Sequence, residues 1–199
     1  EEENEEDFAK MNALAPSDEE YLDSSVYSLA KQRIMWLLIL MISATFTGII
    51  IRQYESVLSS VVILASFIPM LMDTGGNSGS QSSTLIIRGL ALGALEFTDY
   101  PKIIWKEFRV SILVGLVLAF INFLRIYLLE RVDFIVSLTV CISLFATVVL
   151  AKVVGGMLPL IAKKFKLDPA IMAAPLVTTI VDTFALMVYF STATLLMGL

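Results

Sequence analysis

Two acidic residues, Asp73 and Asp182, stand inside long apolar stretches of this 199-residue chain. A charged side chain at the centre of a bilayer is costly, so it marks an ion path or a charged partner. Asn77, Gln81 and Lys152 are the other strongly polar residues that fall deep in such stretches. Carboxylate and amide oxygens are the ligands of hard cations such as Mg²⁺ and Ca²⁺. These residue types therefore favour cation binding in an apolar setting.

The residue types that are missing narrow the chemistry further. The sequence has no histidine and one cysteine, Cys141, which excludes His/Cys zinc sites, Ser-His-Asp triads and intrachain disulfides. Soft metals are disfavoured because neither thiolate nor imidazole is available at the site. Composition does not separate Mg²⁺ from Ca²⁺ or Mn²⁺. Mg²⁺ keeps much of its water and is often held by one or two carboxylates, which suits a wide polar pore.

The segments that would position these residues are those of a membrane protein. Hydrophobic residues make up 57% of the chain, and its mean hydropathy is +0.83. A transmembrane helix needs about 20 mostly apolar residues. Five stretches come close to or exceed that length, at about 34–51, 57–87, 109–129, 134–162 and 170–197. We therefore expect an all-α membrane protein with five transmembrane helices, built from residues 31–199.

The second stretch, 57–87, contains several helix-breaking residues. As one helix it would be roughly 47 Å long, which is more than one simple span requires. We predict that it is interrupted near Asp73–Gly79, a run rich in glycine. Pro69 would also leave the carbonyl of Ala65 without a donor. Such carbonyls are tolerated at membrane depth beside a water-filled cavity, where they can bind a cation.

One face of the fifth stretch is small or polar around Asp182. Residues three and four apart share a side of a helix, and this side consists of Ile171, Ala174, Pro175, Thr178, Asp182, Ala185 and Tyr189. Pro175 would free the carbonyl of Ile171. Counting along the two stretches places Asp73 and Asp182 at similar depth, so they can face one polar path.

Two structural explanations of these polar groups stay open. The oxygen-bearing run that follows Asp73 comprises Asn77, Ser78, Ser80, Gln81, Ser82, Ser83 and Thr84. Small residues with polar groups also serve plain helix packing in membranes. Asp182 could likewise have a structural role by pairing with Lys152.

Charge predicts the orientation in the membrane. Ten of the nineteen acidic residues lie in residues 1–23. With the N-terminus inside, the internal segments hold nine Lys and Arg residues and the external segments three. The positive-inside rule then places the N-terminus in the cytoplasm and the C-terminus outside. Ser17 and Glu20 fit a capping box for a helix over about 18–32. A second short capped helix is expected at the cytoplasmic surface over 98–107.

The run Pro69–Ala91, PMLMDTGGNSGSQSSTLIIRGLA, resembles the signature of MgtE-type magnesium channels. The run Asp168–Asp182 resembles the last span of that family, and the resemblance covers about residues 5–199. It implies a homodimer with the pore between subunits, lined by the second and fifth spans, in which Asp182 is the main acid for a hydrated Mg²⁺. The family's lining positions fall on Asp73, Gly76, Ser80 and Thr84 in the second span, and on Ile171, Ala174, Thr178 and Asp182 in the fifth.

The resemblance also concerns regulation and partners. Full-length members carry a cytoplasmic N-terminal domain and a CBS domain pair that sense magnesium. Residues 1–30 resemble the end of the helix that connects this sensor to the pore, and the sensor itself is expected upstream of this chain. The expected partners are a second copy and membrane lipid, with no nucleic acid.

Two rival functions use the same aspartates. Asp73-Thr74-Gly75 spells the Asp-Thr-Gly of pepsin-like enzymes, and two carboxylates sharing a proton could serve an intramembrane aspartyl protease. That motif belongs on a soluble β fold, so we expect no enzyme. A proton- or sodium-coupled carrier needs the same midplane groups and broken helices as a channel. The sequence leaves the choice between channel and carrier open.

Overall fold

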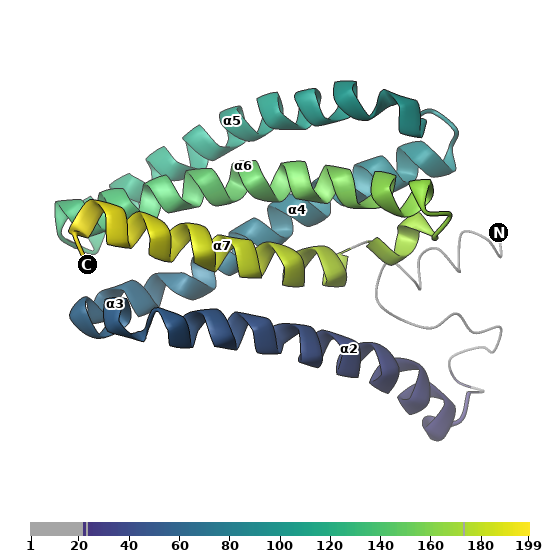
Figure 1. The fold of residues 1–199 in the computed structure, drawn as a ribbon, viewed down its shortest axis with the longest axis horizontal. Helices are drawn as coiled ribbons and strands as arrows, with labels where there is room; N and C mark the ends of the chain where they lie inside the picture. The colour runs from purple at the N-terminus through teal and green to yellow at the C-terminus, as the bar shows by residue number, and fades with distance from the viewer. Residues whose placement is uncertain (1–21, 23, 173) are drawn as a thin grey trace.

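The chain folds into an elongated bundle of long helices that run alternately in opposite directions (Figure 1). The computed structural model describes Leu22 and residues 24–172 and 174–199. The side chains of Gln32, Ile171 and Ala174 lie outside this description. The described residues contain no β-strand. The first long helix starts at the end of the bundle opposite the C-terminus (Figure 1).

Helix α2 spans Val26–Gln53 and contains the predicted first span, 34–51. Ser25 caps it, because its hydroxyl accepts a hydrogen bond of 3.1 Å from the Ser28 backbone N–H. In the described residues the helix therefore begins at Val26, later than the helix predicted over 18–32. The capping box predicted at Ser17 and Glu20 lies outside the described residues.

The second predicted span is interrupted, but not where the sequence suggests. Helix α3 covers Glu55–Ser60, a 3₁₀ segment (η1) covers Val62–Phe67, and helix α4 runs unbroken over Ile68–Ala91. The break predicted near Asp73–Gly79 is wrong, because these residues lie inside α4. Pro69 sits in the first turn of α4, where its missing N–H costs no helical hydrogen bond.

The carbonyl predicted to be free at Ala65 is also occupied. It accepts a hydrogen bond from the Ile68 backbone N–H at the end of η1. The 3₁₀ geometry, with its bonds between residues three apart, supplies the donor that Pro69 lacks. Ala65 therefore offers no helix-break carbonyl of the kind predicted from Pro69.

Helix α5 spans Tyr100–Leu124 and continues into a π-helical turn (η3) at Arg125–Leu129. The 3₁₀ turn η2, Phe97–Asp99, precedes it, with reciprocal capping between Glu96 and Asp99. The separate surface helix predicted over 98–107 is thus wrong, since these residues form the η2 turn and the first turns of α5. Pro101 is in the first turn of α5 and does not break the helix.

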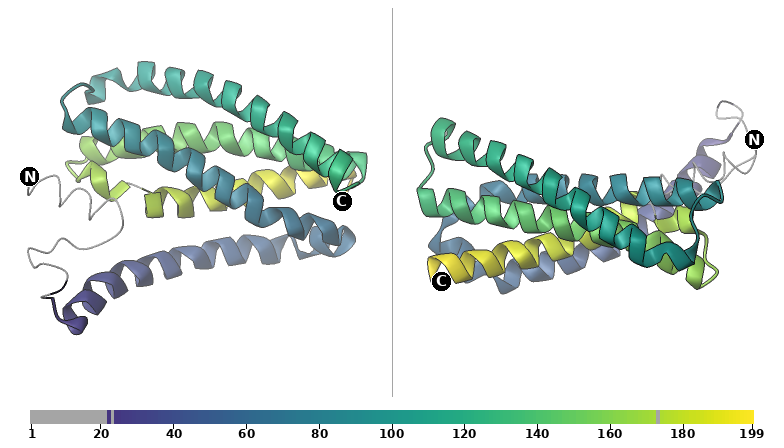
Figure 2. Two further views of the ribbon diagram at one scale, coloured as in Figure 1. Left: turned by 180° about the vertical axis from the view of Figure 1, so that it is seen from behind. Right: turned by 90° about the horizontal axis from the view of Figure 1, so that it is seen from above.

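Helix α6, Phe134–Lys164, is the central element and packs against α4, α5 and α7 (Figure 2). The 3₁₀ segment η4, Pro169–Met172, then leads to α7, Ala174–Met197. The main apolar core lies between α4, α6 and α7, with fully buried Leu71, Val140, Leu186 and Phe190. Helix α6 is therefore buried on several sides, and the two helices that carry Asp73 and Asp182 both pack against it.

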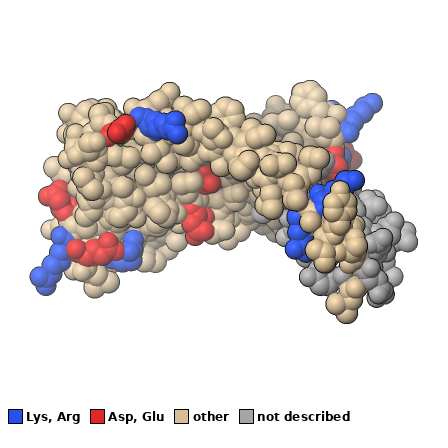
Figure 3. Space-filling model, turned by 90° about the horizontal axis from the view of Figure 1, so that it is seen from below, with Lys and Arg blue, Asp and Glu red and all other residues tan. Residues whose placement is uncertain are grey.

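Within the described residues, four helical stretches are long and apolar enough to cross a membrane: Val26–Gln53, Phe97–Leu129, Phe134–Lys164 and Pro175–Met197. Helix α4 has 24 residues, but it carries the polar run. On the face shown in Figure 3, most of the surface is uncharged, two acidic patches lie near the middle of the bundle, and Lys and Arg side chains lie to either side of it. These features are those of an all-α membrane protein.

Candidate functional site

Asp73 on α4 and Asp182 on α7 lie on helices that pack against each other. Asp73 is exposed and Asp182 is half-buried. Asp73 precedes Gly76 by three residues and Asp182 follows Thr178 by four, and Gly76 and Thr178 meet where α4 and α7 contact, so the two acids lie about one turn from the same contact. The expectation that both acids sit at similar depth in the membrane stays a prediction. Two adjacent carboxylates of like charge form a local site of strong attraction for a divalent cation.

Glycine lets α4 approach α7 beside these acids. A Cβ atom at Gly76 would lie 2.9 Å from Cγ2 of Thr178, closer than real Cβ contacts are. Gly76 and Thr178, both predicted lining positions, therefore face each other across the α4–α7 contact. Gly76 is buried and Thr178 half-buried. Gly76 has no side chain, so it allows α4 and α7 to approach each other closely and offers no side-chain ligand of its own.

A second polar region follows on α4 toward Arg88. Asn77, Gln81 and Thr84 are exposed there and line a groove of about 660 Å³ together with Ser80 and Leu85. These positions share one helix face with Asp73. Ser80, another predicted lining residue, is half-buried, and its hydroxyl has no hydrogen-bond partner among the described residues. Four of the oxygen-bearing residues predicted on the second span thus share one polar face, whereas Ser78, Ser82 and Ser83 of the same run are buried on other sides of α4.

The start of α7 differs from the prediction. The sequence suggests that Pro175 lies inside a helix, but it occupies the second position of α7, where a proline fits without breaking a hydrogen bond. The helix break lies before it, where η4 ends at Met172. The hydroxyls of Thr178 and Thr179 each donate to the Pro175 carbonyl at 2.9 Å. Ile171 and Ala174 stay predictions, because their side chains lie outside the description.

Two polar contacts that sequence reasoning missed hold this region. The Ser83 hydroxyl donates to the Met172 carbonyl at 2.5 Å and ties α4 to the turn before α7. The Ser82 hydroxyl donates to Oε2 of Glu107 at 2.5 Å and ties α4 to α5. Their partners are 89 and 25 residues away. No local sequence pattern predicts such pairs. The two consecutive serines contact different elements, which shows that α4 is buried on more than one side.

Lys152 does not pair with Asp182, the structural alternative considered for both residues. It lies on α6 and donates to Oε1 of Gln81 at 3.4 Å. No ion pair between Lys152 and a carboxylate is formed among the residues that the structure describes. Asp182 is therefore not neutralised by this lysine.

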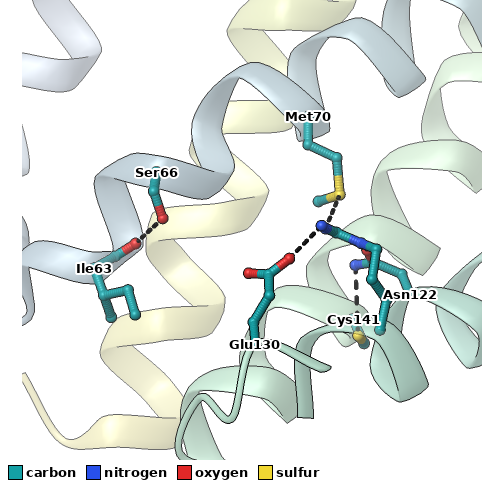
Figure 4. Close-up of polar contacts among 7 residues, drawn as sticks. Ile63, Ser66, Met70, Asn122, Glu130 and Cys141 are labelled. Carbon is teal, nitrogen blue, oxygen red and sulfur yellow. Dashed lines mark hydrogen bonds and ion pairs between the residues drawn. The ribbon is translucent and has the colours of Figure 1, made fainter. Parts of the chain in front are cut away.

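A cluster of polar contacts lies at the C-terminal end of α5 (Figure 4). Arg125 donates to Oδ1 of Asn122 at 3.0 and 3.2 Å, pairs with Glu130, and lies 3.8 Å from the sulfur of Met70. Asn122 in turn lies 3.7 Å from the sulfur of Cys141. Arg125 thus links the π-helical turn to the start of α4.

The described part of the chain contains no group of three or more His, Cys, Asp or Glu residues arranged to hold a metal. The groups here that can contact a cation are the two carboxylates and the neighbouring hydroxyl and amide oxygens.

The fold and the site place the chain in a class of proteins, the all-α membrane proteins, with two acidic residues on neighbouring helices. A profile of the MgtE family, described as divalent cation transporters, matches residues 68–192. The chain belongs to the MgtE family. It is thus a member of a transporter family and not an enzyme, which removes the aspartyl protease alternative.

Curated relatives carry the same family name. A magnesium transporter MgtE of Thermus thermophilus is 38% identical over 197 residues, which cover 96% of this chain and 42% of that protein. One from Bacillus subtilis is 34% identical over 192 residues, and one from Enterococcus faecalis is 28% identical over 189. The chain therefore spans about 42% of the length of the first two relatives.

Proposed function

We propose that this chain forms the pore of a magnesium transporter, through which hydrated Mg²⁺ crosses the membrane along α4 and α7. The observation that carries the proposal is the pairing of Asp73 and Asp182 on these two helices, in a chain of the MgtE family. The relatives described above are named magnesium transporters. Family and site chemistry thus indicate the same cargo.

The hydrated form of the ion follows from the ligands available. Mg²⁺ sheds water reluctantly and is commonly held by one or two carboxylates through retained waters. Asp182 supplies the main charge in our proposal, and Asp73 adds a second. Thr178, Ser80 and Thr84 supply hydroxyls along the same path, with Ile171 and Ala174 as the remaining lining positions. The ion is held loosely enough to leave, as conduction requires.

The exposed polar face of α4 favours a homodimer. Asp73, Asn77, Gln81 and Thr84 are exposed in a single copy, on a helix set among apolar helices. Polar groups of this kind face a water-filled cavity or another protein surface, since lipid cannot satisfy them. A second copy placed against this face would enclose a pore between the two subunits and leave the apolar helices to the lipid.

The proposed orientation places the chain in the cell membrane with five passes, its N-terminus in the cytoplasm and its C-terminus outside. The bias of nine to three in Lys and Arg supports it. In this orientation the loop between α4 and α5 and the loop between α6 and α7 are cytoplasmic. The expected upstream sensor would lie on the same side as these loops.

The experiment is Mg²⁺ flux into proteoliposomes for the chain and for Asp182→Asn, at equal amounts of folded protein. Glu55→Gln is the matched control, because it removes one carboxylate charge at an exposed position of α3 outside the proposed path. We expect Asp182→Asn to abolish Mg²⁺ flux or its preference for divalent ions, and Glu55→Gln to retain both. Unchanged flux in Asp182→Asn would place the ion path elsewhere.

A coupled carrier is the second candidate, because two neighbouring carboxylates could also bind a proton or Na⁺. Imposed proton or sodium gradients, with Mg²⁺ held constant, separate the two mechanisms. A channel gives Mg²⁺ flux that is independent of these gradients, whereas a carrier gives flux that follows one of them.

A further inference from the structure

Lys152 is a buried cationic residue that the proposed path does not use. Its side chain is only 5% exposed, on the side of α6 that meets α4. Its Nζ donates to the side-chain oxygen of Gln81 at 3.4 Å. Among the described residues no carboxylate lies within 4.0 Å of this ammonium. A buried lysine facing a neutral amide is costly, so its presence calls for a reason beyond packing.

Lys152 lies next to a close crossing of α4 and α6 at Gly155. A Cβ atom at Gly155 would overlap the carbonyl oxygen of Gly79 and lie 2.7 Å from its carbonyl carbon, so α4 and α6 touch there backbone to backbone. Lys152 is one turn before Gly155 on α6, and Gln81 is two residues after Gly79 on α4. The crossing therefore holds the ammonium directly behind the polar face of α4.

Gln81 connects this buried charge to the ion path. Its side chain is exposed and lines the groove with Asn77, Ser80 and Thr84. At about 1.5 Å per residue, Gln81 lies roughly 12 Å along α4 from Asp73, toward Arg88. The hydrogen bond from Lys152 engages the only acceptor atom of the Gln81 amide, whose remaining groups are N–H donors.

We propose that Lys152 is a specificity-determining residue of the ion path, acting through Gln81 against ions that need direct oxygen ligands. This inference rests on the proposed function. Ca²⁺ takes six to eight oxygens directly, amide carbonyls included, whereas Mg²⁺ passes with much of its water in place. By engaging the Gln81 oxygen and placing a positive charge behind it, Lys152 denies a partly dehydrated ion a second binding site. Mg²⁺ bound through water loses less from this arrangement.

The test is the ratio of Mg²⁺ flux to Ca²⁺ flux in proteoliposomes, together with the Ca²⁺ concentration that half-blocks Mg²⁺ flux. We expect Lys152→Met to lower the Mg²⁺/Ca²⁺ ratio roughly tenfold, which is the scale of one hydrogen bond to a charged group. Lys152→Arg keeps the charge and the donor, so the ratio should be retained. In the double variant Lys152→Met/Gln81→Leu the released oxygen is gone, and the ratio should return toward that of the parent chain.

A second variant covers the case in which Lys152→Met does not fold. Gln81→Glu leaves Lys152 in place with a counter-ion and gives the groove an additional carboxylate oxygen, so it should also lower the Mg²⁺/Ca²⁺ ratio. A ratio unchanged in both Lys152→Met and Gln81→Glu, or in Gln81→Glu alone where the former does not fold, overturns the role of Lys152. If Asp182→Asn abolishes flux in the same vesicles, the proposed function stands even when the role of Lys152 is refuted. If Asp182→Asn leaves flux unchanged, both proposals fall.

Discussion

Gly155→Ala adds one methyl group where α6 crosses α4. That Cβ would overlap the Gly79 carbonyl oxygen and lie 2.7 Å from the Gly79 carbonyl carbon and 2.9 Å from its Cα, all backbone atoms. Contacts under 3.0 Å essentially do not occur for real Cβ atoms, so the helices must separate by about 1 Å. A flexible side chain could turn away from the methyl group, but a helix backbone can yield only by moving as a unit.

The expected cost follows from two opposing effects. Overpacking of this kind costs about 1–3 kcal/mol, and replacing glycine by alanine in a helix returns at most about 1 kcal/mol. Because the clash is with backbone, we expect a net loss of about 2 kcal/mol in the free energy of unfolding. For a chain of this length that corresponds to a fall in Tm of roughly 4–8 °C.

The assay is thermal unfolding in one detergent for three alanine variants. At Gly48 on α2 no atom lies within 4 Å of the position that a Cβ would take, so Gly48→Ala should leave Tm unchanged or slightly raised. At Gly156 the methyl group would lie 3.2 Å from Cγ of Glu107, a side chain that can shift, so a small effect is expected. A Tm of Gly155→Ala equal to that of Gly48→Ala would refute the close crossing of α4 and α6.

Two further predictions concern the path and the core. Gly76→Ala should reduce Mg²⁺ flux, because its Cβ would lie 2.9 Å from Cγ2 of Thr178. Adding Thr178→Ser removes that methyl carbon and should restore the flux. A double variant as impaired as Gly76→Ala would contradict this explanation. Tyr189→Phe should lower the free energy of unfolding by about 1–2 kcal/mol, since its buried hydroxyl donates to the Leu64 carbonyl at 2.9 Å. Ser59→Ala, which removes an exposed hydrogen bond within α3, is the control in the same denaturation assay and should be nearly neutral.

The apolar pattern is sufficient to predict most helices. The spans predicted at 34–51 and 134–162 match α2 and α6 closely, because length and hydropathy decide such helices without reference to neighbours. The depth of Asp73 and Asp182 in a membrane stays a prediction, but both acids lie about one turn from the same α4–α7 contact, as expected of acids at a similar level. Counting residues from the charged ends of two antiparallel helices is enough for this, as the rise per residue is fixed.

The errors in placing helix breaks share one cause, which is that proline and glycine have different effects at different positions of a helix. The sequence suggests breaks within helices at Pro69 and Pro175, yet both lie in first turns, where the missing N–H is no loss. The glycines of Asp73–Gly79 suggest a site of unwinding, but they remain helical and admit neighbouring helices. Whether a proline or glycine breaks a helix or fits into it depends on the residues that pack around it in the fold, and a single sequence does not identify those residues.

Helix α4, which we propose lines the ion path, is the hardest of the long helices to recognise by hydropathy. It buries glycines and serines against α6 and α7 and exposes Asp73, Asn77 and Gln81 on its remaining face. Its polar content keeps it out of the set of helices apolar enough to cross a membrane by themselves. A pore-lining helix needs little contact with lipid, because its neighbours cover its packed sides and water covers the rest. The low hydropathy of α4 within an otherwise apolar bundle therefore agrees with the proposed ion path along this helix.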